Sequence, residues 1–267
     1  MPEKKWGAGV EVEVHDNVVV VAYNRPERRN AMSPESGQAV AEVLDHYLSE
    51  ENVRVIVMTG RGGHFCAGGD IHSMHSSEGM SAEAGRKRMR KSLHRAERLY
   101  TSDKLVVAAV EGVAFGGGFA SVLLADLVIA SASARFCMSF PRVGLVPDTC
   151  SLYTLPRIVG VQRAKELMLT GREIDAKTAL EYGIAMEVVP EGAALARALV
   201  LARALATTSA TASAMAKTGL NMSLSSDFRS MVEYECAAQG IAFSSDYHRE
   251  AVDRFRSKRE PQFVWPR

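Results

Sequence analysis

Two glycine-rich segments and one aspartate are the residues best suited to chemistry in this sequence. The segments run from Phe65 to Asp70 and from Gly112 to Gly118, and each follows an apolar, strand-like run. Glycines after a strand let backbone N–H groups approach a ligand closely, and a following helix adds positive charge there. Asp148 is the only nearby carboxylate with apolar neighbours. The pattern predicts two N–H groups that stabilise one developing oxyanion beside a single acid/base group.

Other uses of these residues are open at this point. Phosphate binding is disfavoured, because neither glycine segment continues as Gly-Lys-Ser/Thr and the second does not spell G-x-G-x-x-G. Tight turns and helix packing alone explain either segment taken singly, and explain both together less well. Asp148 has a simpler alternative role as the N-cap of the next helix.

The first half of the chain alternates between predicted strands and helices. Ser33 as N-cap and Pro34 at the first helical position predict a helix that ends near Ser49. Polar residues 73–90 predict a lid that continues into a helix ending near residue 100. Strands are predicted over residues 10–15, 18–23, 54–59, 105–110, 126–130 and 135–138, with a helix from residue 119 to 124.

The second half is mainly helical. Periodicity predicts helices over residues 153–159, 164–169 and 176–182, then one strand over residues 185–189. Residues 193–243 are almost wholly helix-forming. A boundary near residues 190–192 therefore predicts an α/β core, residues 1–190, followed by a helical region, residues 191–267.

Composition excludes several classes of protein. The chain has 267 residues, 47% hydrophobic content and a net charge of +1, so no bulk attraction to nucleic acid or a membrane surface is expected. Its four cysteines form no ligand-like spacing with each other or with histidine, so we expect no metal, and they fit a reducing compartment. No apolar stretch reaches the roughly 18 residues that span a bilayer, and the first residues lack a signal-peptide core. We expect a cytoplasmic enzyme.

Four motifs in order resemble the enoyl-CoA hydratase/isomerase (crotonase) superfamily over essentially the whole chain. They are Asn24-Arg25-Pro26 with Asn30-Ala31-Met32, the segment from Phe65 to Ile71, Gly116-Gly117-Gly118, and Ala125-Asp126. The resemblance implies an α/β fold, the crotonase spiral of ββα units, with a helical C-terminal region used in trimerisation. It also implies a homo-trimer or a hexamer built as a dimer of trimers. The implied substrate is a coenzyme A thioester, so coenzyme A belongs to the substrate and no separate cofactor is expected.

The resemblance also implies roles for individual residues. The family's oxyanion hole corresponds to the backbone N–H groups of Gly69 and Gly117, an interaction worth about 3 kcal/mol per donor in comparable sites. An arginine-rich loop corresponds to the segment that lines the coenzyme A phosphates, and a C-terminal F-x-x-K pattern corresponds to residues at the nucleotide end, often from a neighbouring subunit. A solvated arginine run and a ligand-free amphipathic helix would give the same two patterns. The candidate substrate-binding residues are Arg25, Arg28, Arg29, Ala67, Asp70, Ile71, Phe140, Phe255 and Lys258.

Departures from the family pattern bear on the reaction. Hydratases of the family use two glutamates, and Ala120 and Phe140 occupy those two places here. Without a carboxylate pair, water activation together with protonation of the α-carbon is difficult, so ordinary hydration is disfavoured. Asp148 occupies a place used by isomerase branches, where one carboxylate moves a proton from C2 to C4. Its apolar neighbours predict a raised pKa.

Two alternatives remain beside an isomerase. Asp148-Thr149 also resembles the 4-chlorobenzoyl-CoA dehalogenase branch, in which the carboxylate attacks an aromatic carbon and a histidine near the place of His94 assists. Gly69 and Phe140 depart from that branch, whereas Cys150-Ser151 departs from the Gly-Gly pair common in isomerases. The second alternative is a crotonase-fold chain that binds coenzyme A thioesters without catalysis.

Overall fold

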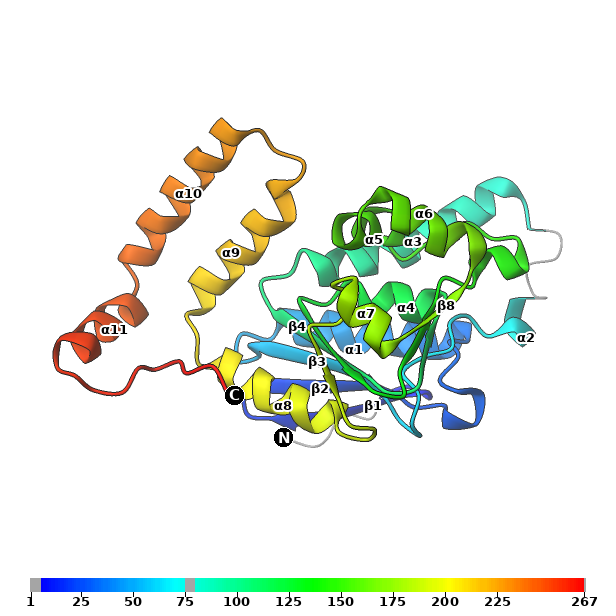
Figure 1. Ribbon diagram of the computed structural model, residues 1–267, viewed down its shortest axis with the longest axis horizontal. Coiled ribbons are helices and arrows are strands. Elements are labelled where there is room, and N and C mark those ends of the chain that lie inside the picture. The colour runs from blue at the N-terminus through cyan, green and yellow to red at the C-terminus, as the bar shows by residue number, and fades with distance from the viewer. Residues whose placement is uncertain (1–5, 75–79, 267) are drawn as a thin grey trace.

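A six-stranded sheet forms the centre of the molecule (Figure 1). The structure is a computed structural model that describes residues 6–74 and 80–266. Only the first strand is antiparallel to its neighbour, and the other pairs are parallel. In spatial order the strands are β1 (Val10–His15), β2 (Val18–Tyr23), β3 (Val55–Gly60), β4 (Leu105–Val110), β6 (Leu127–Ser131) and β9 (Glu187–Val189).

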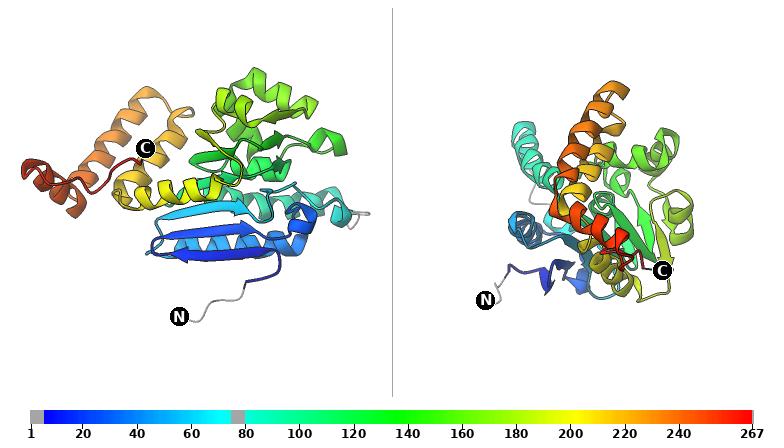
Figure 2. Two further views of the ribbon diagram at one scale, coloured as in Figure 1. Left: turned by 60° about the horizontal axis from the view of Figure 1, so that its bottom comes forward. Right: turned by 90° about the vertical axis from the view of Figure 1, so that its left-hand side faces the viewer.

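Helices cover both faces of this sheet. Successive side chains of a strand point to opposite faces, so Val19 and Val21 of β2 pack towards α1 (Pro34–Ser49) and α3 (Ala82–Tyr100). Val18 and Val20 pack on the other face against α8 (Ala194–Ala206), which runs along the strands in Figure 2. The sheet is therefore buried on both sides, as its run of β-branched residues requires.

A small second sheet carries the loops near the glycine segments. It contains β5 (Val113–Phe115), β7 (Arg135–Cys137) and β8 (Glu173–Asp175). The sequence indicated neither β5, which lies inside the second glycine segment, nor β8. Three-residue strands are too short to show alternation, and they form here because tertiary contacts supply their partners.

Short helices connect these strands. Residues 75–79, inside the predicted lid, lie outside the described residues, and α2 and α3 stand on either side of them. The remaining elements of the core are η1 (Pro26–Arg28), α2 (Ile71–Met74), α4 (Gly117–Val122), η3 (Phe140–Val143), α5 (Ser151–Val159), α6 (Val161–Thr170) and α7 (Ala176–Glu181).

The last three helices extend away from the sheet (Figures 1 and 2). They are α9 (Ala210–Ser223), α10 (Phe228–Phe243) and α11 (Asp246–Arg256). The predicted division at residue 190 remains a prediction, and α8 just after it packs on the sheet. Among the described residues no single helix is long and apolar enough to cross a membrane. The consecutive helices α8 and α9 reach that length and apolarity only when they are taken together, and the angle between them is 112°.

Candidate active site

Asn30 connects the loop before α1 to the loop that precedes the first glycine segment. Its side chain is buried, and Oδ1 accepts the N–H of Arg25 at 2.8 Å. Nδ2 donates to the carbonyl oxygens of Arg61 at 2.9 Å and His64 at 2.6 Å. The side-chain amide thus satisfies three backbone groups of two loops. The sequence marked Asn30 only as part of a motif, and this role was missed.

The two glycine segments pack backbone to backbone. Cys66 and Ala114 form a parallel bridge between them. A Cβ atom on Gly118 would lie 2.2 Å from the carbonyl oxygen of Cys66, and one on Gly68 would lie 2.8 Å from that of Phe115. Gly68 also has a φ of +94°. Only glycine permits this approach, and the approach places the ends of the two segments together.

The two N–H groups predicted to form the oxyanion hole lie at this junction. Met32 donates to the carbonyl of Gly68 and accepts from the N–H of Asp70, so the N–H of Gly69 points to the other side of its segment. Gly117 begins α4, where N–H groups lack partners within the helix. Its nitrogen lies 3.5 Å from the Cβ position of Gly68.

A cavity of about 400 Å³, which we call the Gly69 cavity, opens beside the first of these groups. Gly69, Met32, Leu124 and Thr149 line it, and α1 and α3 form the opposite wall. Three cationic side chains of α3 line the same cavity, namely Arg88, Lys91 and Arg95. Asp70 also lines it, so the wall carries more positive than negative charge.

Asp148 lines a larger space of about 1310 Å³, which we call the Asp148 groove. The groove lies between α3 and residues 145–153, and Leu93, Leu145 and Val146 give it apolar walls. His94 lines it with Asp148, although the His94 side chain is 68% exposed and lies 3.5 Å from Glu97. The other titratable or charged side chains of the groove are Arg86, Arg90, Glu97, Tyr100, Cys150 and Tyr153.

The structure does not place Asp148 and Gly69 in one cavity. Asp148 lines the groove, whereas the next residue, Thr149, lines the Gly69 cavity. Helix α3 separates the two spaces, since Ser92 faces the cavity and the adjacent Leu93 faces the groove. Thr149 therefore connects the predicted base with the predicted oxyanion site, because it hydrogen-bonds to Asp148 and lines the same cavity as Gly69.

Burial and one hydrogen bond determine the direction in which the pKa of the Asp148 carboxyl group shifts. Burial raises its pKa, and the hydroxyl of Thr149, which donates to Oδ1 at 2.9 Å, acts in the opposite direction. The net shift is upward. Such a carboxylate is a stronger base than an ordinary aspartate.

The places of the two hydratase glutamates hold buried apolar side chains. Ala120 of α4 is 0% exposed, and Phe140 at the start of η3 is 7% exposed. Neither position offers a carboxylate to a substrate. Phe140 belongs to the main apolar cluster rather than to a wall of either space.

One arginine of the arginine-rich loop, Arg25, makes contacts within the protein itself. Arg25 donates to the carbonyl of Ala31 at 2.6 Å and pairs with Asp70 at 3.0 Å. Burial would raise the pKa of Asp70, but the hydrogen bonds from Arg25 and from a backbone N–H lower it overall. Arg28 and Arg29 are exposed at the surface of the same loop. Arg25 and Asp70 thus fix each other beside the Gly69 cavity.

The remaining predicted binding residues are spread apart. Ala67 is half-buried, and Ile71 is 62% exposed at the start of α2. Phe255 of α11 is 86% exposed and Lys258 follows that helix, at the opposite end of the molecule from α2 in Figure 1. One chain alone therefore does not bring Phe255 and Lys258 to the glycine segments. Within residues 6–74 and 80–266, no three His, Cys, Asp or Glu side chains are grouped as metal ligands.

Comparison with known proteins identifies the family. The family model for enoyl-CoA hydratase/isomerase matches residues 13–265. The chain belongs to this family.

Relatives within the family differ in their named reactions. The chain is 34% identical to the 1,2-epoxyphenylacetyl-CoA isomerase of Escherichia coli over 94% of this chain and 96% of that one. It is 29% identical to a 4-chlorobenzoyl coenzyme A dehalogenase of an Arthrobacter species, covering 93% and 91%. A crystal structure of an enoyl-CoA hydratase/isomerase from Cupriavidus metallidurans is 38% identical, with a TM-score of 0.93 and 99% coverage of both chains.

Family membership confirms the predicted crotonase fold and an acyl-CoA enzyme family. It leaves the reaction and the site residues to be argued from geometry. The role of Thr149 was not predicted, although a hydroxyl residue directly after the candidate acid was an available signal. Tyr100, which lines the Asp148 groove from the end of α3, was not predicted either.

Proposed function

We propose that this enzyme isomerises an enoyl-CoA thioester by proton transfer through Asp148. The observation that carries the proposal is the pair of consecutive residues Asp148 and Thr149, which face the groove and the Gly69 cavity respectively. In this proposal the thioester carbonyl binds at Gly69 and Gly117, and C2 lies beside Thr149. Thr149 lines the Gly69 cavity and its hydroxyl is 2.9 Å from Asp148 Oδ1, so the carboxyl group reaches C2 there, and the rest of the acyl group extends into the Asp148 groove. The places of the two hydratase glutamates hold Ala120 and Phe140, which favours proton transfer over hydration. Glu97, the other carboxylate of the groove, is 66% exposed and lies 3.5 Å from His94.

The chemistry needs one base and one oxyanion site. The Asp148 carboxylate removes a proton from C2 of a 3-enoyl thioester, and the electron pair moves onto the thioester oxygen as a dienolate. The N–H groups of Gly69 and Gly117 stabilise that oxygen, at about 3 kcal/mol per donor. Asp148 then returns the proton to C4, which gives the conjugated 2-enoyl thioester without net change in composition. Thr149 holds Oδ1, so Oδ2 carries the proton.

The test follows the migrating proton. Incubation with a 3-enoyl-CoA in D₂O should give the 2-enoyl product with deuterium at the α or γ carbon, detected by mass spectrometry and NMR. Asp148→Asn should lower turnover by about 100-fold or more, in line with general acid–base catalysis, while thioester binding survives. Asp227→Asn is the matched control, because Asp227 caps α10 at the exposed surface. Full activity of Asp148→Asn would remove Asp148 from the mechanism.

A dehalogenase-like reaction is the second candidate. Its specific support is that His94 and Asp148 line the same groove. In that reaction an Asp148 oxygen attacks the halogen-bearing carbon of a 4-halobenzoyl-CoA, halide leaves, and water opens the resulting aryl ester with His94 as the base. Halide release, together with an ester trapped on Asp148 after acid quenching, would favour this candidate. Binding of both thioesters with no product from either would favour a non-catalytic protein.

A further inference from the structure

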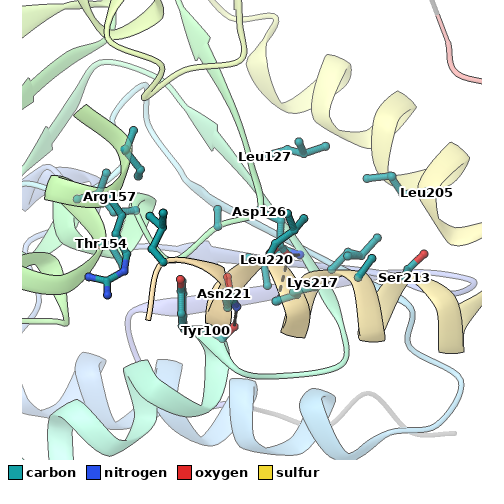
Figure 3. A pocket seen from close by; sticks show the side chains of 17 residues that line it. Tyr100, Asp126, Leu127, Thr154, Arg157, Leu205, Ser213, Lys217, Leu220 and Asn221 are labelled. Atoms are coloured by element: carbon teal, nitrogen blue, oxygen red, sulfur yellow. Dashed lines mark hydrogen bonds and ion pairs between the residues drawn. The ribbon is translucent and has the colours of Figure 1, made fainter. Parts of the chain in front are cut away.

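A separate cavity of about 550 Å³ lies between the core and α9, and we call it the α9 cavity. In Figure 3 Tyr100 and Arg157 lie at one end of it, and Leu205 and Ser213 lie at the other. Ten of the 17 side chains that line it are aliphatic. This size and this apolar character match pockets that hold small ligands.

Two of the three charged side chains in the wall of the α9 cavity pair with each other. Lys217, whose side chain is 5% exposed, donates to Asp126 Oδ2 at 3.0 Å and to the carbonyl of Lys104 at 2.8 Å. Asp126 Oδ2 also accepts the N–H of Val106 at 2.7 Å. The pair is visible at the centre of Figure 3 and fixes α9 against the core. Arg157, the third charged group, lies over the Tyr153 ring at one end of the cavity, so the rest of the wall suits an apolar ligand better than an anion.

Two tyrosines separate the α9 cavity from the Asp148 groove. Tyr100 lines both spaces, and Tyr153 lines the groove while the next residue, Thr154, lines the cavity. The two rings are in edge contact with centroids 6.0 Å apart. Arg157 lies 3.4 Å above the Tyr153 ring, and its Nε is buried without a hydrogen-bond partner among the described residues. Movement or removal of the Tyr100 ring would therefore connect the α9 cavity with the Asp148 groove.

We propose that the α9 cavity binds the distal end of a long aliphatic acyl chain and that Tyr100 controls its entry. The inference rests on the proposed placement of the acyl group in the Asp148 groove. It names the substrate class as long-chain rather than short-chain acyl-CoA thioesters. An aliphatic chain gains most from burial against aliphatic walls, and its affinity rises with each methylene that reaches them.

Filling the cavity should remove the preference for long chains. Ala216→Phe adds a ring to the face of α9 that lines the cavity, whereas Ala214→Phe adds the same ring to a different cavity beside Lys104. Dissociation constants of saturated dodecanoyl-CoA and butyryl-CoA would be measured by calorimetry. Ala216→Phe should weaken dodecanoyl-CoA binding by about 10-fold or more and leave butyryl-CoA within about twofold. Ala214→Phe should leave both unchanged.

Tyr100→Ala provides an independent test in the opposite direction. Removal of the Tyr100 ring, which separates the α9 cavity from the Asp148 groove, should strengthen dodecanoyl-CoA binding relative to butyryl-CoA. If Ala216→Phe fails to fold, this measurement alone tests the proposal, and an unchanged ratio of the two dissociation constants would overturn it. Equal effects of Ala216→Phe on both thioesters, or no effect on either, would overturn the proposal. Because saturated thioesters do not react, a chain-length effect without any isomerisation would reject the proposed function alone. Isomerisation without a chain-length effect would reject the α9 cavity alone.

Discussion

Thr149 donates its hydroxyl to Asp148 Oδ1 at 2.9 Å from a backbone with a left-handed φ of +52°. A β-branched residue rarely adopts this conformation, and such outliers gather at functional sites. Cys150, the next residue, has a φ of +62°. Two consecutive non-glycine residues in this region turn the chain sharply after Asp148, so that Asp148 and Thr149 face different spaces.

Thr149→Val should shift the pH dependence of catalysis. Burial raises the pKa of Asp148 and the Thr149 hydroxyl lowers it, so loss of the hydroxyl raises that pKa further. Asp148 must be ionised to accept a proton, and therefore the acidic limb of kcat/KM should move to higher pH. Thr149→Ser keeps the hydroxyl and should keep the wild-type profile. Coincident profiles for Thr149→Val and wild type would show that the hydrogen bond does not tune the base.

Asp148→Asn should stabilise the protein at neutral pH while it abolishes turnover. The folded-state pKa of Asp148 lies above its unfolded value, so the folded state gains from protonation at low pH and loses that gain as pH rises through the folded pKa. An ionised, half-buried carboxylate then opposes folding, and the neutral amide does not. Thermal unfolding should give a higher Tm for the variant at pH 7, and the gap should close below about pH 4. A gap that persists or widens in acid contradicts the assignment.

Cys150→Gly should be more stable than Cys150→Ala. Both substitutions remove the thiol, but only glycine adopts the φ of +62° without steric cost. The left-handed conformation costs an L-residue about 1–2 kcal/mol, and the greater freedom of unfolded glycine offsets part of the gain. We expect a net advantage of about 0.5–1 kcal/mol for glycine in urea unfolding. Equal stabilities would mean that residue 150 relaxes out of this conformation in solution.

Asn30→Ala should destabilise the fold by about 2–3 kcal/mol, because three buried backbone groups lose their partner. Asn30→Asp should not restore stability at neutral pH, since a carboxylate faces the carbonyls of Arg61 and His64 without a proton to donate. Asn24→Ala is the control, because its hydrogen bond to Glu11 is exposed, and its effect should stay near 0.5 kcal/mol. Denaturant unfolding measures all three. A small loss for Asn30→Ala would show that water replaces the side-chain amide.

Local sequence signals predicted several elements well, but the lid predicted over residues 73–90 was wrong in its second half, because α3 already begins at Ala82 behind the N-cap Ser81. The observed bounds of β2, Val18–Tyr23, β4, Leu105–Val110, and α1, Pro34–Ser49, match the prediction. Apolar, β-branched runs and a capped helix start carry their own information, and Ser33 does accept the N–H of Ser36. In contrast, β5 and β8 form only because they pair with a strand that is distant in the sequence, so no local pattern predicted them.

The sequence by itself determined the chemical inventory of this protein. Glycine at positions 68 and 118, a single aspartate at 148 and apolar residues at 120 and 140 follow directly from residue type, because backbone freedom and side-chain charge are local properties. Only the tertiary structure decided that α3 divides the Gly69 cavity from the Asp148 groove and that Thr149 joins them. Relative placement depends on how distant helices pack on the sheet, and spacing along the chain does not encode it.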